Sequence, residues 1–246
     1  MWELLTEDAL HHVASVAHVQ ALVCLRRLEK RCAAIARAKA RLDDCHRLRL
    51  PPFRQVSPVA ILGLGQADSL CLHSLRPVDD TFLQVLSCAI GSGALPNLVE
   101  LGLEDNEIGD PGLSSLSEAL AKGALPNLKR LELERNQIGD LGITALAESC
   151  AKGVMALKVL HLLDNQITDV GFSTLMPLLK KDGKLSNLTG FSIGSGITDK
   201  GMQEFAEILA MGALASLQTL YVDDGPLGTE HPALKAACEA HGISLE

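Results

Sequence analysis

Residue types that could bind a cofactor or a metal occur at a few places in the 246-residue sequence, with spacings that do not suit that chemistry. The Gly-Leu-Gly sequence at 63–65 lacks the third glycine of a dinucleotide-binding loop, and no helix is predicted to open there. The adjacent pairs at 11–12 (His-His) and 45–46 (Cys-His) lack the separation of about two to four residues that lets two ligands share one zinc ion. Loop and packing roles explain these residues better.

Calcium binding and catalysis have no better support. Asp223 and Asp224 offer carboxylates, but nothing nearby completes a cage of roughly six oxygen ligands. No Ser/His/Asp or Cys/His arrangement can be assembled with a defined geometry. We therefore expect no catalytic, cofactor-binding or metal-binding residues, no cofactor, and a protein that is not an enzyme.

Composition indicates an intracellular protein, either cytoplasmic or nuclear. No apolar run approaches the roughly 18 residues of a membrane span. The N-terminus starts with acidic residues and is not a secretory signal. Seven scattered cysteines, an odd number, favour reduced thiols. We expect no membrane partner.

The net charge of −8 is distributed unevenly. Residues 1–50 carry nine Lys/Arg against six Asp/Glu, whereas the remainder carries thirteen against twenty-four. Because phosphate contacts dominate nucleic-acid affinity, the acidic remainder predicts no nucleic-acid partner.

A pattern of about thirty residues recurs along most of the sequence. Copies begin at Leu98, Leu128, Leu157, Leu188 and Leu217, with spacings of 30, 29, 31 and 29 residues. In the first copy, leucines 101 and 103 alternate with residues 100, 102 and 104, as in a short strand with one buried face. Each copy therefore opens with a predicted strand.

The second half of each copy predicts a helix. An aspartate stands two residues before a glycine at each predicted helix start, where it would serve as N-cap: Asp110, Asp140, Asp169 and Asp199. Apolar residues follow at helical spacing, such as Leu113, Leu116 and Leu120. Glycines stand where the helices should end in a left-handed residue: Gly123, Gly153, Gly183 and Gly212.

This period, with its L-x-x-L-x-L-x-x-N spacing, resembles the leucine-rich repeats of the ribonuclease-inhibitor-like class. The resemblance implies an α/β solenoid with a curved parallel sheet inside and helices outside. It also implies that Asn106, Asn136 and Asn165 form a ladder, satisfying backbone groups in the bend after each strand.

Some parts depart from the pattern. Residues 59–95 read as a worn first repeat, with its strand at either 60–64 or 70–72. Pro177 should kink or shorten the third helix. The fourth copy has Gly-Ser-Gly at 194–196 in place of the asparagine bend. We predict about five to six repeats over 59–246, preceded by a proline-containing linker at 51–58.

Residues 1–50 do not repeat and predict two helices, at about 7–17 and 19–41. Two interpretations stay open. The helices could be an α-helical cap that shields the first repeat. Alternatively, the segment from 5 to 36 resembles an F-box, although Thr6, Ala17 and Cys32 depart from that motif. The F-box resemblance implies docking to the adaptor subunit of an SCF-type ubiquitin ligase through Leu5, Leu10, Val13, Leu22 and Leu25.

Strand residues that face away from the leucines should line the concave face, where acids outnumber arginines by eight to two. The candidate partner-binding residues are Glu100, Glu104, Asp105, Arg130, Glu132, Glu134, Arg135, His161, Asp164, Tyr221, Asp223 and Asp224. Such a face suits a protein partner with a basic surface. Tyr221 is the best candidate for an aromatic anchor, and His161 could make binding sensitive to pH.

The sequence thus predicts a non-enzymatic protein-interaction module, which would be an SCF substrate receptor if the F-box resemblance holds. The alternative is a structural or regulatory scaffold, similar to ribonuclease inhibitor, in which the N-terminal helices only cap the solenoid.

Overall fold

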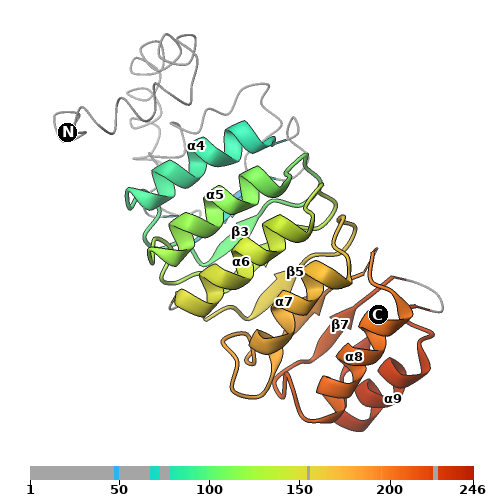
Figure 1. Cartoon of the computed structure of the whole chain (residues 1–246). Helices are drawn as coiled ribbons and strands as arrows, with labels where there is room; N and C mark the ends of the chain where they lie inside the picture. The colour runs from blue at the N-terminus through green and yellow to red at the C-terminus, as the bar shows by residue number, and fades with distance from the viewer. Residues whose placement is uncertain (1–46, 50–66, 73–77, 154–155, 195, 224–226) are drawn as a thin grey trace, which may run out of the picture.

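The computed structural model describes residues 47–49, 67–72, 78–153, 156–194, 196–223 and 227–246 (Figure 1). The two predicted N-terminal helices, the F-box-like residues and the linker at 51–58 lie outside these residues. Within the described part, no helix is both long enough and apolar enough to span a membrane.

Strands and helices alternate along the described chain. The strands are β1 (Arg47–Arg49), β2 (Ser69–Cys71), β3 (Glu100–Gly102), β4 (Arg130–Glu132), β5 (Val159–His161), β6 (Gly190–Ser192), β7 (Thr219–Tyr221) and β8 (Ser244–Leu245). The helices are α4 (Asp80–Gly91), α5 (Asp110–Ala121), α6 (Asp140–Lys152), α7 (Asp169–Leu179), α8 (Asp199–Ala210) and α9 (Pro232–His241). Figure 1 shows the helices side by side on one face of the strands.

All the strands form one parallel sheet, in the order of the chain from β1 to β8. The register places Leu101, Leu131 and Leu160 side by side in neighbouring strands. These leucines are completely buried between the sheet and the helices. The predicted α/β solenoid is therefore confirmed. The strand of the worn first repeat is β2, at the second of the two predicted positions. The sheet also extends beyond the predicted start of the repeats at residue 59, because β1 pairs with β2.

The asparagine ladder holds the bends after β3, β4 and β5. In the middle rung, Asn136 Oδ1 accepts a hydrogen bond from Ile108 N of the preceding repeat at 3.0 Å. Its Nδ2 donates to the carbonyl of Leu103 in the preceding repeat at 2.9 Å and to that of Leu133 in its own at 3.1 Å. Asn106 and Asn165 make equivalent bonds. Each rung thus satisfies buried backbone groups on both sides of a repeat boundary.

The prediction that the aspartates cap their own helices was wrong. Gly109 is the N-cap of α5, and Asp110 is its first residue. The carboxylate of Asp110 instead reaches the start of α6, where Oδ1 accepts from Gly139 N at 2.7 Å and from Gly142 N at 2.9 Å. Helix starts leave backbone N–H groups without intrahelical partners, and these stacked repeats satisfy them from the neighbouring helix.

The same aspartate ladder continues on both sides of this pair. Asp80 bonds the start of α5, Asp140 that of α7, and Asp169 that of α8. The motif also explains its glycine. A Cβ at Gly142 would lie 2.7 Å from Asp110 Oδ1 and 3.2 Å from Asp110 Cα, so the preceding aspartate fills the space of a side chain.

The helix ends follow the prediction in part. Gly123 and Gly212 have positive φ, at 76° and 83°, as a left-handed helix end requires. Gly153 caps α6 with φ of −80° and ψ of 171°, so the left-handed prediction was wrong there, and Gly183 does not have a positive φ. Pro177 lies in the last turn of α7, which has 11 residues where α6 has 13.

Candidate functional site

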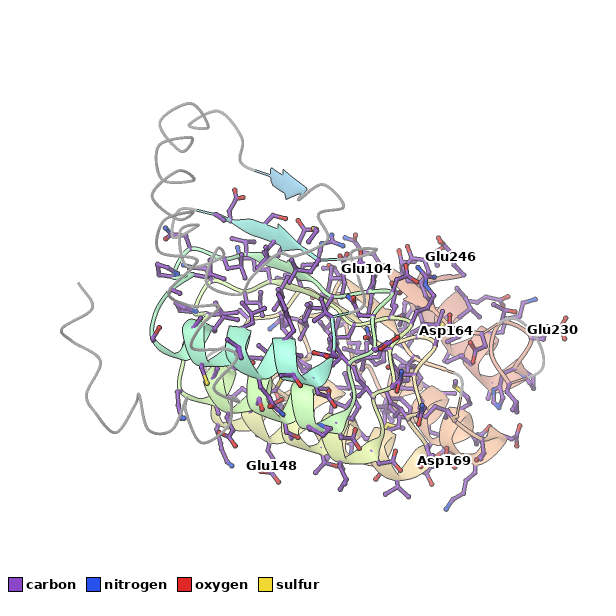
Figure 2. All side chains as sticks on the ribbon, turned by 90° about the horizontal axis from the view of Figure 1, so that it is seen from above. Glu104, Glu148, Asp164, Asp169, Glu230 and Glu246 are labelled. Atoms are coloured by element: carbon purple, nitrogen blue, oxygen red, sulfur yellow. The ribbon has the colours of Figure 1, made fainter. Side chains whose placement is uncertain are left out.

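The concave face consists of the side chains of β2 to β7, and of the residues just after these strands, that point away from the helices. Figure 2 shows Glu104 on the strand side of the molecule, and Glu148 and Asp169 on the helix side. The described part of this face includes seven of the eight predicted carboxylates and both predicted arginines, because Asp224 lies outside the described residues.

Both arginines of the concave face pair with carboxylates of the same face. Arg130 lies 3.2 Å from Glu132 Oε1 and 3.9 Å from Glu100 Oε1. Arg135 makes two hydrogen bonds to the carboxylate of Asp105. Among the described side chains of this face, seven carboxylates thus stand with two guanidinium groups, and the acidic groups are in excess.

A rim of left-handed residues lies where the strands end. Asp105, Arg135 and Asp164 have φ of 57°, 51° and 55°, and each directly precedes an asparagine of the ladder. Aspartate and asparagine tolerate this conformation better than most residues. The sharp bend therefore occurs at one level in three successive repeats, and the charged side chain of each bend belongs to this rim.

Three polar side chains from successive repeats meet near the middle of the face. Ser192 Oγ accepts hydrogen bonds from Leu162 N at 2.8 Å and Leu163 N at 3.1 Å, and lies 3.3 Å from Glu134 Oε1, to which it donates. The Nδ1 atom of His161 lies 3.5 Å from the same carboxylate oxygen. These contacts leave Ser192 with no exposed surface.

The His161 and Tyr221 rings meet edge to face across β6, with centroids 5.5 Å apart. They come from β5 and β7, which both pair with β6, so they approach each other over the small residues of that strand. Beside them, a Cβ at Gly194 would lie 2.5 Å from Asp223 Oδ2, which shows that the Asp223 carboxylate fills the space left by this glycine.

Burial shifts two ionisable groups of this cluster. It raises the pKa of Glu134, although the hydrogen bond from Ser192 and the charge of Arg135 act in the opposite direction. Burial also lowers the pKa of His161, against the opposing effect of Glu132.

Sequence reasoning missed that Ser192, His161 and Glu134 come together. Their order differs from that of a catalytic triad, because the serine hydroxyl contacts the carboxylate and is fully buried. Sequence reasoning also missed the contribution of β2 to the concave face, where Ser69 donates to Glu100 at 3.0 Å and Cys71 lies beside Gly102. Their alternation with the buried Leu70 and Leu72 was the available signal. Among the described residues no group of His, Cys, Asp and Glu is arranged to hold a metal ion.

Comparison with protein families supports the class of fold. Residues 94–117, 124–147 and 155–176 match the Leucine Rich repeat family model. Each match covers a strand, its asparagine bend and the first part of the following helix: β3 with α5, β4 with α6, and β5 with α7. The chain therefore carries leucine-rich repeats, which typically form surfaces that bind other proteins. No curated protein matches the chain.

Proposed function

We propose that this chain is a non-enzymatic protein-interaction module whose concave face binds a protein with a basic surface. The observation that carries the proposal is the charge balance of the face. Among the described side chains of β2 to β7 and the residues just after them, seven carboxylates stand with two guanidinium groups, so this part of the face is acidic. Complementary charge steers a partner to the surface and sets its orientation.

Tyr221 supplies the anchor of this proposed surface. Its side chain is half-buried, and its ring packs edge to face with that of His161. An aromatic ring that is already ordered loses little entropy on binding, which is one reason why tyrosines are frequent among residues that dominate binding energy. The partner would then combine basic residues over β3 and β4 with an apolar contact at Tyr221.

A labelled polylysine peptide tests whether the face binds basic chains. We expect the triple variant Glu104→Gln, Glu132→Gln, Glu134→Gln to bind it about tenfold more weakly, since each exposed charge contact contributes a few tenths to one kcal/mol. The matched control is Glu118→Gln, Glu148→Gln, Glu239→Gln, which removes three exposed carboxylates from helices. Equal losses in both variants would contradict a specific face.

The natural partner can be sought with the same variants. Affinity purification with mass spectrometry should recover a basic protein with the wild-type chain and with the helix-side control. The concave-face variant should lose it. Recovery by all three proteins would place that partner elsewhere on the chain.

The N-terminal segment gives the proposal a finer form. The F-box resemblance supports a substrate receptor of an SCF-type ubiquitin ligase, in which the solenoid presents the bound protein. A pull-down with the adaptor subunit should succeed with the wild-type chain and fail with Leu10→Asp, Leu22→Asp. No binding by the wild-type chain would end the receptor hypothesis.

The rival form is a structural or regulatory scaffold of the ribonuclease-inhibitor-like class, with the N-terminal helices as a cap. It predicts that deletion of residues 1–45 exposes the first repeat and aggregates the protein. It also predicts that no adaptor subunit is captured by the full chain.

A further inference from the structure

Positive and negative charges are separated between the two edges of the solenoid. In three successive repeats, the connections from strand to helix (103–110, 133–140 and 162–169) contain eight acidic residues and one arginine. The connections from helix to strand (121–129, 151–158 and 180–189) contain seven lysines and one aspartate. We call the second set the lysine edge: Lys122, Lys129, Lys152, Lys158, Lys180, Lys181 and Lys184.

The side chains of the lysine edge are exposed, and few of them form an ion pair or a hydrogen bond with another described residue. Lys152 lies 3.3 Å from Glu148, and Lys158 donates to the carbonyl of Asn187 at 3.2 Å. Within the described residues, the other five lysines of the edge make neither an ion pair nor a hydrogen bond through their side chains. Most of this positive charge therefore has no paired carboxylate in the part of the chain that the structure describes.

Helix stability accounts for only part of this pattern. Lysines near a helix C-terminus interact favourably with the helix dipole, which explains Lys122, Lys152 and Lys180 at the ends of α5, α6 and α7. Lys129 and Lys158 instead directly precede β4 and β5, and the N–H of Lys158 donates to the carbonyl of Lys129 at 2.7 Å. The edge is thus basic across both the helix layer and the strand layer.

The acidic strand-to-helix connections form the opposite edge, the acidic edge, and they do not neutralise the lysine edge for an approaching partner. The helices between the two edges have 11 to 13 residues, so they separate the edges by about 18 Å. Charges at this separation are largely screened, because the Debye length at physiological ionic strength is about 8 Å. A charged partner therefore experiences each edge as a separate surface.

We infer that the lysine edge is a second docking surface, which binds an acidic protein segment while the concave face remains open. The composition of the edge favours an acidic protein over other anions. These three connections contain no arginine and no aromatic residue, the side chains that commonly contact nucleic acids, and none of the bulky aromatic groups that strengthen binding to a bilayer.

A labelled polyglutamate peptide tests this inference on the full chain. We expect Lys129→Ser, Lys158→Ser, Lys184→Ser to bind the peptide about tenfold more weakly than the wild type. The control variant is Lys200→Ser, Lys235→Ser, which removes exposed lysines of α8 and α9 away from the edge and should leave the affinity unchanged. Both variants should keep the thermal midpoint of the wild type, because the replaced side chains are exposed.

The outcomes distinguish this inference from the proposed function. Polylysine binding should be unaffected by the lysine-edge variant. If the wild-type chain bound polyglutamate but not polylysine, the result would contradict the proposed concave-face site and leave the lysine edge supported. Absence of polyglutamate binding, or equal losses in the edge and control variants, would overturn the second surface. It would also be overturned if vesicles containing phosphatidylserine bound through these lysines while polyglutamate did not.

Discussion

Asp140, the first residue of α6, accepts two hydrogen bonds from Thr168, the residue that caps α7. Thr168 N lies 2.8 Å from Asp140 Oδ1, and Thr168 Oγ1 lies 2.7 Å from Asp140 Oδ2. The same carboxylate accepts from Gly171 N at 3.0 Å. One side chain therefore completes the start of a helix in the next repeat, and neighbouring helices are held in register.

The first prediction concerns this carboxylate. Asp140→Ala should lower the free energy of unfolding by about 1–2 kcal/mol, as does loss of a helix cap, whereas Asp182→Ala, at an exposed residue outside the helices, should be nearly neutral. Burial raises the pKa of Asp140, but the hydrogen bonds from Thr168 and Gly171 outweigh it and lower the pKa overall. The stabilisation should therefore be present above about pH 4 and disappear as the pH falls through the pKa of the folded state. Urea unfolding at several pH values measures both effects, and a pH-independent difference would contradict the assignment.

A second prediction reverses the usual effect of alanine in a helix. Replacing a helical glycine by alanine ordinarily stabilises a protein by about 0.5–1 kcal/mol. A Cβ at Gly171, however, would lie 2.5 Å from Asp140 Oδ1 and 2.9 Å from Asp140 Cα, so Gly171→Ala should destabilise the protein. Gly91→Ala is the control, because its Cβ would meet only the Ala119 Cβ, at 3.9 Å. Thermal unfolding should shift in opposite directions for the two variants, and stabilisation by both would mean that Asp140 does not occupy this space.

The facing of β4 gives a third prediction. Leu131 has no exposed surface, so Leu131→Ala should cost roughly 2–5 kcal/mol of unfolding free energy. Glu132 lies on the opposite face and forms a partly exposed ion pair with Arg130, so Glu132→Ala should be nearly neutral. Chemical denaturation of the two single variants provides the measurement. Comparable losses of unfolding free energy would show that the buried and exposed faces of β4 are assigned incorrectly.

The fourth prediction concerns His161. Because burial lowers its pKa, the imidazole should titrate below about 6.5, which nuclear magnetic resonance of the ring protons can follow. Glu132 opposes this shift, so Glu132→Gln should lower the pKa of His161 further. Since the unfolded chain binds the proton more readily, this group stabilises the fold above about pH 6.5 and loses that contribution as the pH falls through the lower pKa of the folded state. A rise of the pKa in Glu132→Gln would contradict the arrangement.

Most of the solenoid could be predicted because its constraints are local. Alternating leucines, the asparagine after each strand and the glycine after several helices each report on a backbone geometry within a few residues. Leu131 and Asn136 therefore lie where the pattern placed them, buried in the core and in the ladder.

The relations between repeats could not be predicted in the same way. Asp110 has the sequence context of a cap for its own helix, yet its partners are Gly139 and Gly142 in the following repeat. Likewise, Ser192 meets Glu134 because a single strand, β5, lies between β4 and β6 in the sheet, although the two residues are 58 positions apart in the chain. A single sequence does not show which of several equally spaced neighbours a side chain reaches.

The hydrogen bonds of the aspartate ladder also determine how far the effect of a substitution extends along the solenoid. Each joins a helix only to the next one along, and no described rung reaches across two boundaries. A substitution in one repeat should therefore destabilise the adjacent repeats and have little effect on distant ones, because each repeat is coupled only to its nearest neighbours. The molecule would then tolerate change most readily at its two ends, and a break in the middle would leave two shorter stacks, each still in register.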